Sequence, residues 1–174
     1  MQLDMQEIPA IVGHHGREYK ISLIHLRTRM KYSEIHANQR SETIAGVLQR
    51  AMTALPPFHL VVTDNAMMFT MTYTAHPERT TAFEQAIVRL GLRHWRIPRG
   101  QPWCNGFIER SNRTDNEECF HQHRFICTEE RRYIHRLWEM SYNATRPHQG
   151  LDGATPLAVY QRDYRFDANA RLLR

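Results

Sequence analysis

Two stretches of the sequence place acidic and amide side chains where they could bind phosphate or a metal ion. In the first, polar residues recur at the spacing i, i+3, i+4 and i+7, namely Glu109, Asn112, Arg113 and Asn116. On a helix this spacing puts a carboxylate, a guanidinium and two amides on one face. Taken alone the stripe is typical of a solvated helix, where the Glu109–Arg113 pair contributes only a few tenths of a kcal/mol.

The second stretch is the apolar run 58–63, which ends directly before Asp64. Such a run predicts a buried strand that delivers a carboxylate at its carboxyl end, where open α/β sheets place their ligands. The loop before the first stretch contains Pro98, Gly100 and Pro102, so its helix is expected to begin only after Asn105, a good N-cap. Together the two stretches indicate a phosphate and metal site.

The elements that must position these residues follow from the periodicity of the chain. Alternating apolar and polar residues predict three strands with short connections, which should pair antiparallel, at 1–8, 18–29 and 30–37. Helical spacing predicts a helix from Ser41 that ends before Pro56, and another that opens at Pro77 and stops at Gly91. Two short runs predict further strands, at 58–63 and 92–97.

Two more helices are predicted after the polar stripe. Thr128 is expected to cap the first, whose inward face would carry Ile134, Leu137, Trp138 and Tyr142. Thr155 and Pro156 are expected to start a short final helix through Tyr160. The order βββαβαβα is that of the ribonuclease H-like fold: a mixed five-stranded sheet, three strands antiparallel and then two parallel, with helices on both faces.

Composition indicates one globular domain with a basic surface. The chain has 174 residues, 41% of them hydrophobic and 24% charged, which we divide into a domain at 1–166 and a tail at 167–174. The net charge is +5, and all basic residues except Lys20 and Lys31 are arginine. Arginine suits bidentate phosphate contacts, so nucleic acid is the leading partner, although a charge of this size could also be merely solubilising.

Cysteine and histidine usage argues against a zinc site or a disulfide framework. The three cysteines form no C-x-x-C pair, and neither His14-His15 nor His121-x-His123 has the partners that zinc requires. Reduced thiols predict a cytoplasmic protein. No apolar run approaches the length of a membrane span, and no signal-peptide pattern occurs at the N-terminus, so no membrane partner is expected.

Three motifs resemble, in order, the signatures of the integrase catalytic core. They are T-D-N-A-M-M-F at 63–69, P-R-G-Q-P-W-C-N-G-F-I-E-R at 98–110, and Y-N-A-T-R-P-H-Q-G-L-D-G-A-T-P at 142–156. The resemblance is closest to bacterial insertion-sequence transposases of the IS481 and IS3 type, and it covers nearly the whole chain. Three ordered motifs are far more specific than one.

The resemblance implies a DDE site in which Asp4, Asp64 and Glu109 are catalytic and hold Mg²⁺ or Mn²⁺, as two ions. Asp64 and Glu109 match the motifs directly. Asp4 is assigned because it is the only aspartate before Asp64 and lies on the first predicted strand; the alternative is a surface acid on a frayed terminus.

The resemblance also suggests residues that contact DNA. Asn65 would orient Asp64 or a water, and Asn112 and Arg113 would hold phosphates. Arg146 and His148 would either do the same or anchor the last turn of the fold. Trp103 would stack on a base or serve as a partly buried loop anchor.

The implied function is cleavage of DNA and transfer of 3′-hydroxyl ends to target DNA, by a homodimer or higher oligomer on DNA in the bacterial cytoplasm and nucleoid. Three departures qualify it: Ala66 stands where relatives have Gly, the gap from Asp64 to Glu109 is 45 residues, and only three residues precede Asp4, leaving no room for a helix-turn-helix. The alternatives are an inactive remnant that binds DNA non-specifically and a ribonuclease H-like nuclease.

Overall fold

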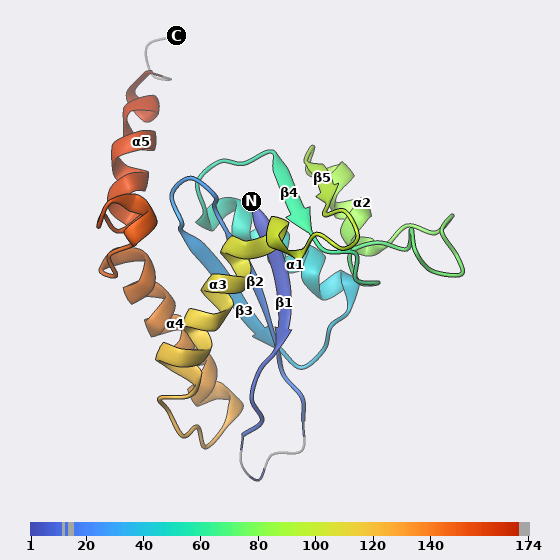
Figure 1. Ribbon diagram of the computed structural model, residues 1–174, viewed down its shortest axis with the longest axis horizontal. Helices are drawn as coiled ribbons and strands as arrows, with labels where there is room; N and C mark the ends of the chain where they lie inside the picture. Colours follow the sequence, from blue (N-terminus) through green and yellow to red (C-terminus); the bar gives the residue numbers. More distant parts are fainter. Residues whose placement is uncertain (12, 14–15, 171–174) are drawn as a thin grey trace.

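A five-stranded mixed sheet forms the centre of the molecule. The computed structural model describes residues 1–11, 13 and 16–170 (Figure 1). The strands are β1 (Gln2–Glu7), β2 (Tyr19–Ile24), β3 (Lys31–His36), β4 (Leu60–Thr63) and β5 (Arg93–Arg96), and they lie in the order β3-β2-β1-β4-β5. β1, β2 and β3 pair antiparallel, while β4 is parallel to both β1 and β5. The predicted fold class is therefore confirmed.

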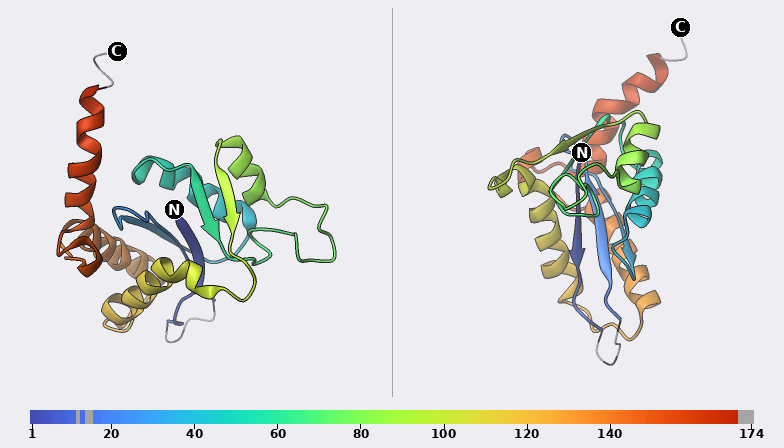
Figure 2. Two further views of the ribbon diagram at one scale, coloured as in Figure 1. Left: turned by 45° about the horizontal axis from the view of Figure 1, so that its top comes forward. Right: turned by 90° about the vertical axis from the view of Figure 1, so that its right-hand side faces the viewer.

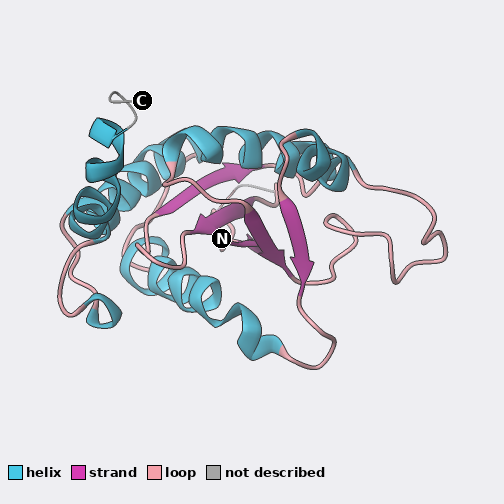
Figure 3. Ribbon diagram, turned by 90° about the horizontal axis from the view of Figure 1, so that it is seen from above, coloured by secondary structure: helices cyan, strands magenta, loops and turns pink. Residues whose placement is uncertain are grey.

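Helices cover both faces of the sheet (Figures 2 and 3). One face carries α1 (Ser41–Ala54) and α2 (Ala82–Arg89), and the other carries α3 (Gly106–Asp115) and α4 (Thr128–Ala144). α5 (Pro156–Ala170) packs on α4 and points away from the sheet (Figure 1). Three single-turn elements complete the chain: η1 (Pro102–Asn105), η2 (Asn116–Phe120) and η3 (Gln149–Leu151).

The two faces of the sheet differ in polarity because strand side chains alternate between them. The face under α1 and α2 is apolar and includes Leu3, Ile21, Leu23 and Val61, which are fully buried. The face under α3 and α4 receives the intervening residues, among them Asp4, Lys20, Lys31 and Ser33. Asp4, the functional candidate on β1, and the two lysines of the protein thus lie on one polar face of the sheet.

Most predicted elements are present, and their limits differ for local reasons. α2 begins at Ala82 and not at Pro77, because Thr81 and Glu84 form a capping box that sets the start of the helix. α4 is capped by Cys127 and not by Thr128; the Cys127 Sγ accepts a hydrogen bond from the Glu130 N–H at 3.4 Å.

The predicted inward face of α4 is only partly correct. Tyr142 is buried, and Ile134 and Trp138 pack against a small apolar cluster, but Leu137 is exposed. Arg131 and His135 are buried in its place. The helix therefore rests on the polar face of the sheet through polar as well as apolar side chains.

The C-terminal part of the chain is more helical than predicted. α5 does not end at Tyr160 but continues to Ala170, across the expected start of the tail at 167. Residues 171–174 of that tail, and the His14-His15 pair, lie outside the described residues. No helix within the described ranges is long and apolar enough to cross a membrane.

Candidate functional site

Asp4 lies on the central strand of the sheet. β1 is paired on one side with β2 and on the other with β4, so the strand is not a frayed terminus. Leu3 is fully buried in the apolar core and Met5 packs against that core, which turns the Asp4 carboxylate to the opposite face, under α3. Asp4 therefore lies on the first predicted strand and not on a frayed terminus, while its role in the site stays a prediction.

Asp64 lies beside Asp4 at the end of the neighbouring strand. Gln2 pairs with Val62 across the parallel strands, and continuing this register by two residues brings Asp4 level with Asp64. The Asp64 Oδ1 accepts a hydrogen bond from the Ala66 N–H at 3.0 Å. Among the described non-glycine residues, only Arg29 and Asp152 have positive φ, so Ala66 is not strained where relatives have Gly.

The extra length between Asp64 and Glu109 is accommodated in a loop. Residues 64–81, between β4 and α2, contain no helix or strand, and in Figure 1 this segment extends to the right of the sheet. Because the loop lies outside the sheet, it leaves the positions of Asp64 and of α3 unaffected.

α3 is fixed over β1 by Gln2. The Gln2 Oε1 accepts a hydrogen bond from the Ile108 N–H at 3.0 Å, and its Nε2 donates to the Cys104 carbonyl at 2.6 Å. Asn105 occupies the N-cap position as predicted, but its side chain makes no capping hydrogen bond. Gln2 satisfies a free N–H of the first turn instead, a long-range cap that periodicity alone could not reveal.

Asn112 connects the helix to the central strand. Its Nδ2 donates a hydrogen bond to the Asp4 Oδ2 at 2.7 Å, and the residue is buried. Glu109 lies three residues earlier on the same helix and is exposed. We call Asp4, Asp64 and Glu109 the acidic group.

The acidic group raises the proton affinity of its buried member. Burial raises the pKa of Asp4 to about 6, the carboxylates of Asp64 and Glu109 add to the rise, and a backbone hydrogen bond from Met5 and the charge of Lys20 oppose it. Carboxylate oxygens are the donors that Mg²⁺ prefers, and a cation would relieve this repulsion. Among the described residues, however, no three acidic, histidine or cysteine side chains stand close enough to hold one ion.

The other predicted DNA-contacting residues lie in different surroundings. Asn65 donates to the Ile97 carbonyl at 2.8 Å, which ties the Asp64 loop to the end of β5. Arg113 is exposed on α3. Arg146 forms a bidentate ion pair with Glu118, at 2.6 and 3.0 Å. Trp103 is 70% exposed, so it is not a buried loop anchor.

His148 belongs to the last turn of the fold. Its backbone N–H and carbonyl bond to Ala154 and Gly153, and its ring meets the Tyr142 ring edge-on at 4.7 Å. Burial lowers the pKa of His148 to about 4. The imidazole is therefore neutral at neutral pH and carries no charge with which to attract a phosphate.

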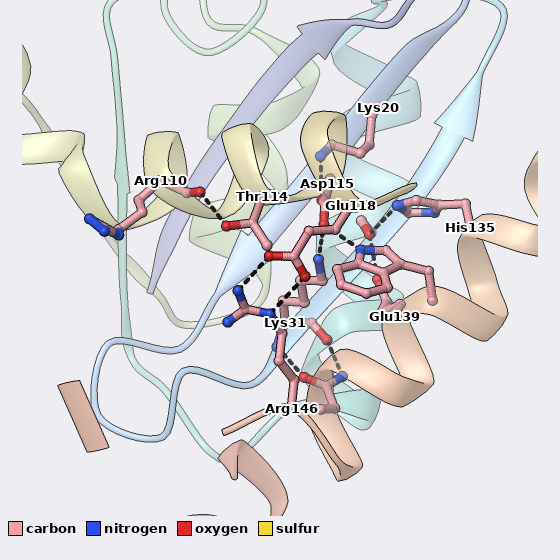
Figure 4. Close-up of polar contacts among 12 residues, drawn as sticks. Lys20, Lys31, Arg110, Thr114, Asp115, Glu118, His135, Glu139 and Arg146 are labelled. Carbon is pink, nitrogen blue, oxygen red and sulfur yellow. Dashed lines mark hydrogen bonds and ion pairs between the residues drawn. The ribbon is translucent and has the colours of Figure 1, made fainter. Parts of the chain in front are cut away.

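A second charged cluster at the other end of α3 was not expected from the sequence (Figure 4). Lys20 of β2 and Lys31 of β3 both donate to the carboxylate of Asp115, and Trp138 Nε1 donates to the Asp115 Oδ1 at 2.8 Å. Lys20 is 0% and Lys31 2% exposed. We call these four residues the lysine cluster. Strong burial would raise the pKa of Asp115, but the two lysines hold it well below its usual range.

The comparisons with known proteins agree with the fold. Residues 90–156 match the family model described as integrase core domain. An uncharacterized protein of insertion element IS476 from Xanthomonas euvesicatoria is 31% identical over 105 residues, covering 60% of this chain and 28% of the relative. The corresponding IS407 protein of Burkholderia multivorans is 32% identical over 95 residues, covering 54% of this chain and 34% of the relative. The matches thus span about a third of each relative's length.

Solved integrases have the same architecture at low sequence identity. A chain of the simian T-cell lymphotropic virus intasome in complex with a PP2A regulatory subunit aligns with a TM-score of 0.69 and 15% identity, over 91% of this chain and 52% of that one. The HTLV-2 integrase catalytic core with magnesium gives 0.66 and 10%, over 91% and 93% of the two chains. The BIV integrase catalytic core gives 0.66 and 16%, over 96% of each.

The sheet order and the helices on its two faces define the ribonuclease H-like class to which integrase catalytic cores belong. Within that class, residues 90–156 of this chain are similar to the integrase core domain, and the chain is similar to proteins of two bacterial insertion elements over 105 and 95 residues.

Proposed function

We propose that this chain catalyses metal-dependent cleavage of DNA and the transfer of 3′-hydroxyl ends to target DNA, with Asp4, Asp64 and Glu109 as its catalytic residues. The observation that supports the proposal most is the pairing of Gln2 with Val62 between β1 and β4, because continuing this register by two residues would bring Asp4 level with Asp64, near the helix that bears Glu109. Three acids from distant parts of the chain are what polynucleotidyl transfer requires.

The acidic group would hold Mg²⁺ or Mn²⁺, as two ions. When bound, such ions lower the pKa of an attacking water or hydroxyl and stabilise the leaving oxygen. The surrounding residues prepare the ligands: Asn112 holds one oxygen of Asp4, and the Ala66 N–H holds one oxygen of Asp64. The side chains must approach one another to share an ion.

DNA would lie along the basic side of the acidic group. Between residues 85 and 113 Glu109 is the only acid, whereas six arginines occur. Of these, Arg113 and Arg110 lie on the exposed side of α3. We propose that Arg113 contacts phosphates and that Asn112 acts through Asp4. Arg146 and His148 would support the last turn, because one is paired with Glu118 and the other is neutral.

The setting of the reaction follows from the relatives. Proteins of bacterial insertion elements act on the DNA of their host, so we place this chain in the bacterial cytoplasm. We also propose that it works as a homodimer or higher oligomer, since two DNA ends must be brought to one target. Contacts with element ends would come from parts of the full-length relatives that these matches do not span.

The decisive experiment uses a branched oligonucleotide that mimics the product of strand transfer. Transesterification is reversible, so an active chain with Mn²⁺ should resolve the branch into a joined strand and a released 3′-end without needing an element end. Asp64→Asn should abolish both products, while Asp152→Asn, which changes an exposed aspartate in the last turn, should not.

Three outcomes separate the candidate functions. Joined products support the transferase, and shortened products alone indicate a nuclease. DNA binding without any product indicates the inactive remnant, an alternative favoured by the absence of a ready three-acid ligand set in the described residues. As a readout besides activity, Mn²⁺ should raise the melting temperature of the wild type more than that of Asp64→Asn.

A further inference from the structure

Trp95 lies on the same face of the sheet as the acidic group. Trp95 pairs with Val62 across β4 and β5, and Val62 pairs with Gln2 across β4 and β1. Paired residues point to the same side of a sheet, and Gln2 points to α3 through its bonds to Ile108 and Cys104. The Trp95 side chain therefore faces the side on which Asp4 lies.

The register also sets how far Trp95 is from Asp64. Trp95 lies on β5, the strand next to β4, and its partner Val62 is two residues before Asp64. The pairing of β4 and β5 continues beyond Trp95, since the Ile97 N–H donates to the Thr63 carbonyl at 3.0 Å. Strands lie about 4.8 Å apart and rise about 3.3 Å per residue, so the two Cα atoms are roughly 8 Å apart. One nucleotide could span that gap.

The alternation of β5 leaves this face open. His94 and Arg96 point to the opposite face, where the His94 ring meets Phe83 at 5.2 Å and Arg96 donates to Thr70 Oγ1 at 3.0 Å. Arg93 and Trp95 point to the face where α3 packs against β1 and β2. Trp95 is 42% exposed and Arg93 is exposed.

The charge around Trp95 favours an anionic ligand. Of the residues that the structure describes, none forms an ion pair with Arg93, and Arg110 and Arg113 on α3 are likewise unpaired by acids. By contrast Arg50, Arg131 and Arg146, at the other side of the molecule, are each matched by a glutamate. An exposed indole next to Arg93 on one face of the sheet is a combination that suits the bases and phosphates of single-stranded nucleic acid.

We propose that Trp95 stacks on an unpaired base next to the phosphate held at the acidic group, with Arg93 on a neighbouring phosphate. The proposal rests on the proposed function, which places DNA at Asp64. Bases inside a duplex are already stacked, so only a frayed or overhanging nucleotide can offer a free face to the indole. The chain should thus prefer DNA ends that carry unpaired bases.

The test measures binding of the full chain to two DNA duplexes, one blunt and one with a short single-stranded overhang. EDTA is present, so binding is read without any metal-dependent reaction, and failure of the proposed catalysis cannot mimic failure here. Wild type should prefer the overhang. Trp95→Ala should bind the overhang about tenfold more weakly and the blunt duplex unchanged, and Trp95→Phe should keep most of the preference.

Controls make each outcome decisive. Tyr133→Ala removes an exposed aromatic residue from α4, which packs on β3 at the opposite edge of the sheet, and should change neither affinity. Arg93→Gln should weaken binding to both duplexes and reduce the slope of log affinity against log salt by about one. If circular dichroism shows that Trp95→Ala is poorly folded, Trp95→Phe provides the test. The overhang duplex should quench the tryptophan fluorescence of Trp95→Phe less than that of the wild type. Equal overhang preference in wild type and Trp95→Ala, or unchanged quenching in Trp95→Phe, overturns the proposal.

Discussion

α3 lies beside two aspartates in opposite states. Asn112 of this helix donates to Asp4, whose pKa is raised to about 6, chiefly by burial, with Asp64 and Glu109 adding to the rise. At the last residue of the helix, Asp115 is enclosed by Lys20 and Lys31, and its pKa is depressed. Asp4 thus has no directly bonded cation among the described residues, whereas Asp115 has two. The comparison teaches that burial raises the pKa of a carboxylate only where bonded cations do not outweigh it.

The largest expected effect tests whether the acidic group takes part in catalysis. Asp64→Asn and Glu109→Gln should each reduce metal-dependent cleavage by about 10³-fold or more, because each removes a ligand from the ions that stabilise the transition state. Melting temperature should be unchanged or slightly higher. Denaturing gels with the branched oligonucleotide give the rate, and activity equal to wild type in either variant would remove the acidic group from the mechanism.

The next effect tests whether the lysine cluster is structural. Asp115→Asn leaves two buried ammonium groups without their counter-ion and should destabilise the fold by about 3–5 kcal/mol, measured by urea denaturation. Replacing the charged members together, by Lys20→Met, Lys31→Met and Asp115→Leu, should recover much of this loss. A small effect of the single change would mean that the lysines are not held by Asp115.

A smaller effect concerns Glu139, which accepts a hydrogen bond from Ser33 beside this cluster (Figure 4). Burial raises the pKa of Glu139 from 4.5 to about 7, against the opposing effects of Ser33 and Lys31. The folded state then keeps a proton that the unfolded chain has lost, so stability falls as pH rises from 4.5 to 7. Glu139→Gln should be more stable than wild type at pH 8, by on the order of 2 kcal/mol, and nearly equal to it at pH 4. Denaturation at the two pH values measures this difference in stability. A Glu139→Gln variant that is more stable than wild type only at pH 4 would contradict the prediction.

The smallest effect is the counterpart of Asp115→Asn. Asp4→Asn relieves repulsion among the acidic group and can still accept from Asn112, so without metal it should stabilise the fold by about 1 kcal/mol or less. The same substitution type would then have opposite effects at the two aspartates. A loss of stability comparable to that of Asp115→Asn would contradict the comparison.

The acidic group was predictable because its members lie in patterns that are local in sequence. Asp64 follows an apolar run, Glu109 belongs to a polar helical stripe, and Asp4 interrupts an alternating strand. Each pattern is fixed by a few neighbouring residues, and the family resemblance joined them. The sheet order followed from the sequence of elements for the same reason.

The lysine cluster was not predictable because its partners are far apart. Lys20 and Lys31 alternate with apolar residues, as solvent-facing positions of a strand do. Their buried charges are compensated by Asp115, which lies 95 residues from Lys20 and 84 residues from Lys31 in the sequence. Gln2 is similar, since its role as a cap depends on Ile108. Short-range signals were also missed: the Thr81–Glu84 capping box is visible in the sequence, and Pro77 was preferred as the start of α2.

The position of β1 in the middle of the sheet has a consequence for the order of folding. β1, β2 and β3 are joined by short connections and can pair soon after they are made. The opposite edge of β1 must wait for β4, about 60 residues later, and the two lysines must wait for α3. Contacts between distant segments are slow to form because of their loop-closure entropy. The pairing of β1 with β2 and β3 can therefore form before the three acids come together, so the acidic group is assembled late in folding.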